Sequence, residues 1–195
     1  MTTITASRLI CIRFALPSAF LFVLASVSHA HPGHSAETGG IGWGLAHPFT
    51  GMDHLLAALA AGMLAAVWRR PSVVATFLCS GVIGGFAGVK IGAFIGLETM
   101  LALSVLVFGL ALAFRKHVTR SVVLAIVALG AAAHGWAHGS EAGGAMSITG
   151  IFLGTAAIVA FGAGIAFVVR RMPRVVAGLG AGIATAAFAI MAGIL

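Results

Sequence analysis

Residues 47–54 of the chain read His-Pro-Phe-Thr-Gly-Met-Asp-His, and an apolar run follows them as far as Val67. Three ionisable side chains, His47, Asp53 and His54, therefore stand at the head of a segment long enough to cross a membrane. A charge placed in hydrocarbon costs at least about 2.5–3.5 kcal/mol. A partner, a proton or a metal must offset this cost, so the stretch predicts a functional site inside a membrane.

The composition excludes an ordinary soluble protein. Of the 195 residues, 61% are hydrophobic and 8% are charged, with a mean hydropathy of +1.14; a soluble domain carries roughly 25% charged residues. The formal net charge of +7 would suit a nucleic-acid binder. The basic residues, however, fall in short clusters between apolar runs, as they do in membrane proteins. We therefore expect the partner to be a lipid bilayer, with no nucleic acid bound.

The N-terminal 1–30 segment has the pattern of a secretory signal peptide, with Arg8 and Arg13 before an apolar stretch and a small-x-small cleavage site at 28–30. The alternative is an uncleaved first helix, which the shortness of the apolar stretch disfavours. After cleavage, residues 31–42 would form a short exported tail. Its two histidines either capture metal or belong to a plain linker.

Six apolar segments follow and define a membrane domain over 43–195. They cover about 43–67, 72–89, 92–114, 121–139, 145–169 and 174–194. Each is within or close to the length of a membrane span, and the short connections favour neighbouring antiparallel helices. The predicted fold is an all-α membrane protein, a six-transmembrane-helix bundle after the signal peptide.

The basic residues predict the orientation. Of the nine Lys and Arg after residue 30, only Lys90 follows an even-numbered segment. The other eight follow the first, third and fifth segments; they are Arg69, Arg70, Arg115, Lys116, Arg120, Arg170, Arg171 and Arg174. The positive-inside rule places these eight in the cytoplasm. Both mature termini would then lie on the periplasmic side of a bacterial inner membrane.

Small residues recur at four-residue spacing, as in Gly84/Gly88, Gly88/Gly92 and Gly92/Gly96. This spacing permits close contact between membrane helices. It says nothing about a substrate, and it predicts that the second, fifth and sixth segments are mainly scaffold.

A second polar cluster, His134-Gly-Trp-Ala-His138-Gly-Ser-Glu141, ends the fourth segment about eighty residues after the first. His134 and His138 are one helical turn apart, so on a helix they share a face at about 6 Å. Glu141 can join that face unless Gly139 ends the helix first. With the predicted orientation, both clusters lie in the outer half of the membrane.

A third acid, Glu98, is expected about two turns into the third segment, at a similar depth. It can be read as a metal ligand, a charge-balancing base or a proton carrier. It can equally be read as an ion-pair partner of Lys90. The sequence leaves these readings open.

The donor types favour a divalent transition metal. On a regular helix Asp53 would point about 100° away from His54, so Pro48 and Gly51 predict that the first helix is broken, or begins late. We expect direct ligation by His54, His134 and His138, with Asp53 either binding the ion or hydrogen-bonding a histidine. Imidazole and carboxylate without thiolate suit Ni, Co or Zn. Because ligating histidines must be neutral, binding should weaken below roughly pH 6.5.

The motifs His47-x5-Asp53-His54 and His134-Gly-x-x-His138-Gly-x-Glu141 resemble those of the HupE/UreJ family, accessory membrane proteins of hydrogenase and urease regarded as nickel or cobalt permeases. The resemblance covers the whole mature chain, and it implies roles for both motifs and for Glu98. Ala133 stands where an aromatic residue often precedes the first histidine of the second motif, a small departure.

The resemblance implies uptake of Ni²⁺ or Co²⁺ as cargo, with no permanently bound cofactor, for the maturation proteins of a metalloenzyme. The residues alone leave two other functions open. One is a membrane-embedded zinc metalloenzyme with His134, His138 and Glu141 as ligands. The other is a haem-binding electron carrier that uses His54 and His134. The sequence leaves the oligomeric state open, so a homo-oligomer remains compatible with it.

Overall fold

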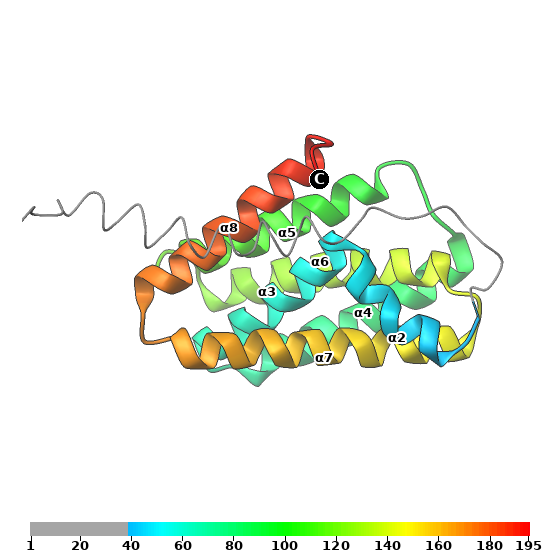
Figure 1. Cartoon of the computed structure of the whole chain (residues 1–195), viewed down its shortest axis with the longest axis horizontal. Helices are drawn as coiled ribbons and strands as arrows, with labels where there is room; N and C mark the ends of the chain where they lie inside the picture. The colour runs from blue at the N-terminus through cyan, green and yellow to red at the C-terminus, as the bar shows by residue number, and fades with distance from the viewer. Residues whose placement is uncertain (1–38) are drawn as a thin grey trace, which may run out of the picture.

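The computed structural model describes residues 39–195, and every regular element in that range is a helix (Figure 1). The helices are α2 (Ile41–Thr50), α3 (Met52–Trp68), α4 (Pro71–Ile91), α5 (Leu97–Ala113), α6 (Arg120–Glu141), α7 (Ala145–Val169) and α8 (Pro173–Met191). The predicted signal peptide at 1–30 and the tail up to residue 38 lie outside the described residues. The expected all-helical membrane class agrees with this architecture.

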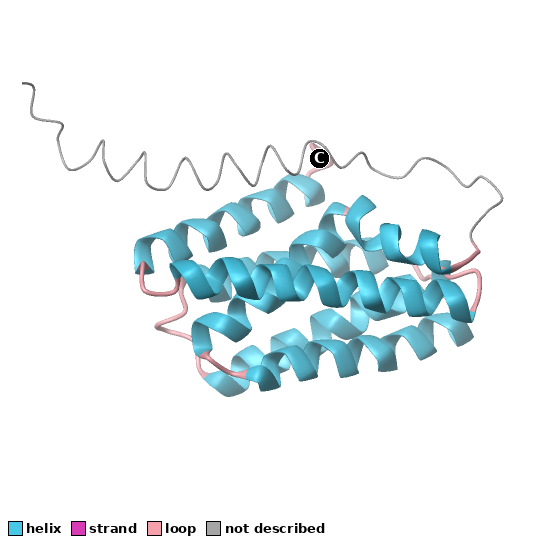
Figure 2. Cartoon of the chain, turned by 60° about the horizontal axis from the view of Figure 1, so that its bottom comes forward, coloured by secondary structure: helices cyan, strands magenta, loops and turns pink. Residues whose placement is uncertain are grey.

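The helices lie side by side, and their connections gather at two opposite ends of the bundle (Figure 2). Four of the described helices, α4, α6, α7 and α8, are long and apolar enough to cross a membrane individually. The pair α2 and α3 passes the same test as one broken span, and α5 is a shorter apolar helix of 17 residues. The six predicted segments therefore correspond to four single helices, one broken pair and one short helix.

The break in the first segment lies at Gly51, and the two helices on either side are bent by 85°. Pro48 lies in the last turn of α2 and has no backbone N–H to donate into the helix. Gly51 then takes an extended conformation with φ −89° and ψ 119°. The break separates His47 on α2 from Asp53 and His54 on α3.

The closest contacts join two halves of the chain, one made of α2–α5 (with α2 and α3 as its broken first span) and the other of α6–α8. α3 packs on α7, α4 on α6, and α5 on α8. Glycines make these contacts tight: a Cβ on Gly84 would collide with the Ala132 carbonyl, and one on Gly135 with the Gly81 carbonyl. The first helix of each half thus packs on the second helix of the other, and third packs on third. This exchange is the one expected when two three-helix halves are related by a pseudo-two-fold axis.

The third segment begins later than the sequence predicted. α5 starts at Leu97 rather than at residue 92, because Gly92 and Gly96 have φ values of +81° and +94°, which end one helix and precede the next. These two glycines therefore do not belong to a helix-packing stripe. Glu98 lies in the first turn of α5 and is exposed, so the prediction that it sits two turns inside was wrong.

Large apolar side chains cover the outside of the bundle as well as its core. Phe108, Leu64 and Leu112 are fully buried. Phe86, Leu129 and Val168 are nevertheless 68%, 73% and 74% exposed. Exposed apolar surface on this scale would be unfavourable in water and suits hydrocarbon. The packing therefore agrees with a chain of multiple membrane-spanning helices.

Candidate metal site

A buried group of polar side chains joins the start of α3 to α6. Asp53, His54 and His134 each offer one ligand atom, and these atoms lie within 4.8 Å of one another. Around one ion with ligand bonds of about 2.0–2.1 Å, donor atoms can be at most about 4 Å apart. Shifts of less than about 1 Å would therefore let all three bind one ion. We call these three residues the inner group.

The break at Gly51 lets Asp53 and His54 act together. One carboxylate oxygen, Oδ1 of Asp53, accepts the backbone N–H of His54 at 2.9 Å and also lies 2.7 Å from His54 Nδ1. The first bond satisfies one of the free N–H groups at the start of α3, where an acid is also favoured by the helix dipole. The second fixes the imidazole: with Nδ1–H donated to the carboxylate, His54 Nε2 keeps its lone pair.

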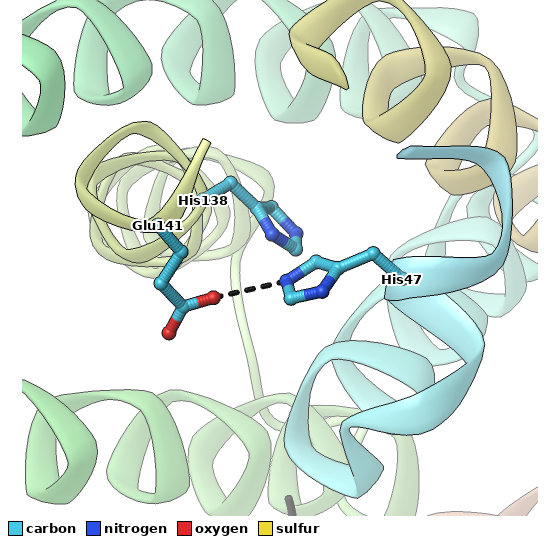
Figure 3. A group of neighbouring side chains, drawn as sticks. All are labelled: His47, His138 and Glu141. Carbon is cyan, nitrogen blue, oxygen red and sulfur yellow. Dashed lines mark ion pairs between the residues drawn. The ribbon is translucent and has the colours of Figure 1, made fainter. Parts of the chain in front are cut away.

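A second group lies beside the first, nearer to the end of the bundle. His47, His138 and Glu141 also offer ligand atoms within 4.8 Å of one another, and Figure 3 shows them converging from α2 and α6. His47 Nε2 lies 2.9 Å from Glu141 Oε2, and the Glu141 side chain is 35% exposed. The His47 ring stacks on Trp43 with 4.5 Å between centroids. We call these three residues the outer group.

His138 connects the two groups. Its ring centroid lies 4.2 Å from that of His54 and 5.3 Å from that of His47. The His54 and His134 rings are 5.0 Å apart and nearly perpendicular. Four imidazoles thus form a continuous chain from the outer group to the interior of the bundle.

Three imidazole nitrogens in this chain have no protein partner. Among the residues that the structure describes, His54 Nε2, His134 Nδ1 and His138 Nδ1 are buried and make no hydrogen bond. An unpaired buried polar atom costs about 1–3 kcal/mol. The three residues also line one cavity of about 40 Å³ between α3, α4, α6 and α7, together with Thr155, whose buried Oγ1 is likewise unpaired. Three histidines that line one small cavity and each keep an unpaired ring nitrogen supply donors of the type that suits a divalent transition metal.

Six of the seven residues predicted from the sequence are brought together in these two groups. Glu141 is part of α6, which continues beyond Gly139 to the acid itself. Glu98 is the exception: it is exposed at the start of α5, and within the described residues it forms no ion pair with Lys90.

Sequence reasoning missed Ser104. This serine on α5 lies 2.9 Å from His134 Nε2 through its hydroxyl oxygen. A serine inside an apolar helix normally bonds its own backbone, and in the sequence nothing distinguishes this one.

Comparison with known proteins agrees with the motifs. The family model described as HupE / UreJ protein matches residues 19–190. The chain belongs to the HupE/UreJ family. Protein HupE of Rhizobium leguminosarum bv. viciae is 36% identical over 137 residues, covering 67% of this chain and 69% of that protein. No solved structure matches the chain.

HupE/UreJ proteins are accessory transporters rather than enzymes. The alternative of a membrane-embedded zinc metalloenzyme is therefore set aside. Membership of HupE/UreJ and the apolar helices together make the chain a membrane protein of the transporter class.

Proposed function

We propose that the chain is a permease for Ni²⁺, with Co²⁺ as a second cargo, that moves the ion across the bacterial inner membrane and supplies it for hydrogenase or urease maturation. The observation that carries this proposal is that three histidines, each with a buried and unpaired ring nitrogen, line one cavity and belong to two groups that also contain carboxylates. Imidazole and carboxylate donors suit these ions, and the absence of thiolate from the two groups disfavours Cu⁺.

The two groups would act in series. The ion first meets the outer group, where His47, His138 and Glu141 are partly exposed. It then passes through His138 to His54 and His134, which are 7% and 4% exposed. At each stage new imidazole ligands replace the water that the ion loses. Stepwise replacement keeps the cost of dehydration low, as in other ion pathways.

The orientation predicted from the basic residues belongs to the same proposal. The eight clustered Lys and Arg lie in or beside the connections α3–α4, α5–α6 and α7–α8, which the helix directions put at one end of the bundle. The two groups lie toward the other end, where α6 finishes. With the basic end in the cytoplasm, the outer group faces the periplasm. Glu98 lies at this periplasmic end as well, where its charge attracts cations to the entrance. A cleaved peptide at 1–30, a tail at 31–42 and a membrane domain of six crossings at 43–195 complete the proposal.

The cavity argues against the haem alternative. Its volume is about 40 Å³, whereas sites for organic ligands run to about 300–1,000 Å³. The His54 and His134 rings are 5.0 Å apart and already in edge contact, so no flat macrocycle fits between them. A single ion with little or no water fits the same space.

Uptake of radiolabelled nickel by cells that carry the protein tests the proposal. We expect His54→Ala and His138→Ala to lose nearly all uptake, because each removes one of the three open nitrogens. Normal uptake by either variant, present in the membrane at the wild-type amount, would contradict the proposed pathway.

His117→Ala is the matched control. His117 is exposed in the α5–α6 connection, at the end of the bundle opposite to both groups. We expect this variant to import nickel at the wild-type rate. Competition of unlabelled cobalt and zinc with labelled nickel uptake ranks the three ions by preference.

A further inference from the structure

We propose that Ser104 is a positioning residue of the metal site: its hydroxyl accepts the Nε2–H of His134 and so leaves Nδ1 of that ring as the nitrogen that binds the ion. This inference rests on the proposed function and adds α5 to the elements that build the site.

The proton count sets the direction of the hydrogen bond. Ser104 Oγ lies 2.7 Å from the Leu101 carbonyl oxygen, which can only accept, so the single hydroxyl proton is donated there. Toward His134 Nε2, at 2.9 Å, the hydroxyl oxygen must then act as the acceptor. The proton of a neutral His134 ring is therefore on Nε2.

The other nitrogen of the ring is left with a lone pair. His134 Nδ1 is buried and makes no hydrogen bond to any residue that the structure describes. The same residue forms the inner group with Asp53 and His54. A lone pair in this place, unpaired in the protein, is what a metal ion needs.

Ser104 and Asp53 have the same role for two different histidines: each accepts the N–H of one ring nitrogen, Nε2 in His134 and Nδ1 in His54. Asp53 holds Nδ1–H of its histidine and leaves Nε2 open. Ser104 holds Nε2–H and leaves Nδ1 open. The two neutral rings thus present their open nitrogens while their protons face protein oxygen. Such partners of metal-binding histidines typically contribute about 10–100-fold to metal affinity.

The backbone is arranged to bring Ser104 this close. Gly130 lies one helical turn before His134 on α6, and a Cβ there would come within 2.9 Å of Ser104 Cβ and 2.6 Å of Phe108 Cζ. The absence of a side chain at Gly130 therefore lets α5 approach α6 at the level of the hydrogen bond. Ser104 and Phe108, themselves one turn apart, fill that gap.

Nickel binding to the purified full-length protein in detergent tests the assignment. We expect Ser104→Ala to weaken nickel affinity by about 10–100-fold, because the His134 ring loses the group that fixes its tautomer and its orientation. Ser104→Thr keeps the hydroxyl, and a groove of about 250 Å³ lined by Ser104, Met100 and Val107 has room for the added methyl. We expect this conservative variant to bind nickel nearly as tightly as the wild type.

Thr185→Ala is the control for a general helix effect. Thr185 is exposed on α8 and donates its hydroxyl to its own backbone, at the Ala181 carbonyl, in the same manner as Ser104. Loss of that hydroxyl should leave nickel affinity unchanged. An equal loss in Thr185→Ala and Ser104→Ala would mean that the serine acts only through its helix, which would overturn the proposal.

A spectroscopic readout separates positioning from folding. Nitrogen-15 NMR of the histidine rings, with the His134 signals assigned by their loss in His134→Ala, reports the tautomer without metal. We expect Nε2–H in the wild type and a shift toward Nδ1–H in Ser104→Ala. Nδ1–H in the wild type would overturn the assignment.

The two proposals fail in different ways. If the wild type binds nickel and Ser104→Ala binds it equally tightly, the role proposed for Ser104 is wrong, while the proposal of a permease is unaffected. If the wild type neither binds nor imports nickel, both fall.

Discussion

The inner and outer groups have similar side chains but differ in what those side chains already bind. In the inner group, His54 and His134 each commit one ring nitrogen to a protein oxygen and leave the other buried and unpaired. In the outer group, His138 also keeps an unpaired nitrogen, but His47 Nε2 is already engaged by Glu141, and the His47 ring is covered by Trp43. An ion entering the inner group thus meets prepared donors, whereas one entering the outer group must displace an existing ion pair.

This difference indicates a division of labour. Preorganised, desolvated donors bind tightly because little reorganisation remains to be done. A partly exposed ion pair contributes only about 0–1 kcal/mol and exchanges easily. The inner group should therefore determine affinity, and the outer group should determine how readily the ion enters. The following predictions test that contrast, from the largest expected effect to the smallest.

The largest effect is expected at Asp53. Asp53→Ala removes the acceptor that holds His54 Nδ1–H, so nickel affinity should fall by about 10–100-fold. Asp53→Asn keeps an oxygen that accepts this N–H and should lose less. Isothermal titration of the purified variants with nickel measures both. Equal losses in the two variants would show instead that the carboxylate itself binds the ion.

An intermediate effect is expected at Gly51. A Cβ there would lie 3.1 Å from Asp53 Oδ1 and 3.2 Å from His54 Nδ1, so Gly51→Ala must push the pair apart by a few tenths of an ångström. The backbone itself, at φ −89°, accepts alanine without strain. Overpacking of about 1 kcal/mol corresponds to a loss of affinity of about fivefold.

Gly164→Ala is the control for this substitution. Gly164 lies within α7, and a Cβ there meets nothing within 4 Å. Nickel titration of this variant should match the wild type. If Gly51→Ala also binds nickel as tightly as the wild type, the Asp53–His54 pair tolerates displacement, which would contradict a preorganised inner group.

The smallest effect is expected at Glu141. Glu141→Gln weakens a partly exposed contact to His47, so the KM for nickel uptake should rise by about twofold, as expected for ~0.5 kcal/mol. The maximal rate should stay the same, because the inner group is untouched. Thr149→Ala, an exposed position on α7 at the same end of the bundle, serves as the control in the uptake assay. A loss at Glu141 as large as that at Asp53 would remove the distinction between the groups.

The sequence predicted those parts of the site that follow from the free-energy cost of placing charged groups in a membrane. A charge in hydrocarbon needs a reason, and this requirement identified both clusters and the apolar segments around them. Pro48 and Gly51 predicted the break, because one lacks an N–H and the other a side chain. The four-residue spacing placed His134 and His138 on one face of α6, where the structure has them.

What depends on tertiary contact was not predictable. Which ring nitrogen stays open is decided by Asp53 on one side and by Ser104 on a helix distant in sequence on the other. The exposure of Glu98 follows from the positive φ of Gly92 and Gly96, which shortens α5, whereas hydropathy counts these residues as part of a span. The 85° bend was not predictable either, since α2 packs mainly on α7, a helix about one hundred residues later in the chain.

That bend has a mechanical consequence. α2 packs chiefly on α7, where Gly44 and Gly150 bring the two backbones into contact, and Gly51 connects it to α3. His47 thus lies on the short helix α2, whereas His54 lies on α3 and is buried inside the bundle. Because the residues that line the cavity lie on α3, α4, α6 and α7 and none lies on α2, a change in the bend at Gly51 would move His47 away from Glu141 and leave the lining of the cavity in place.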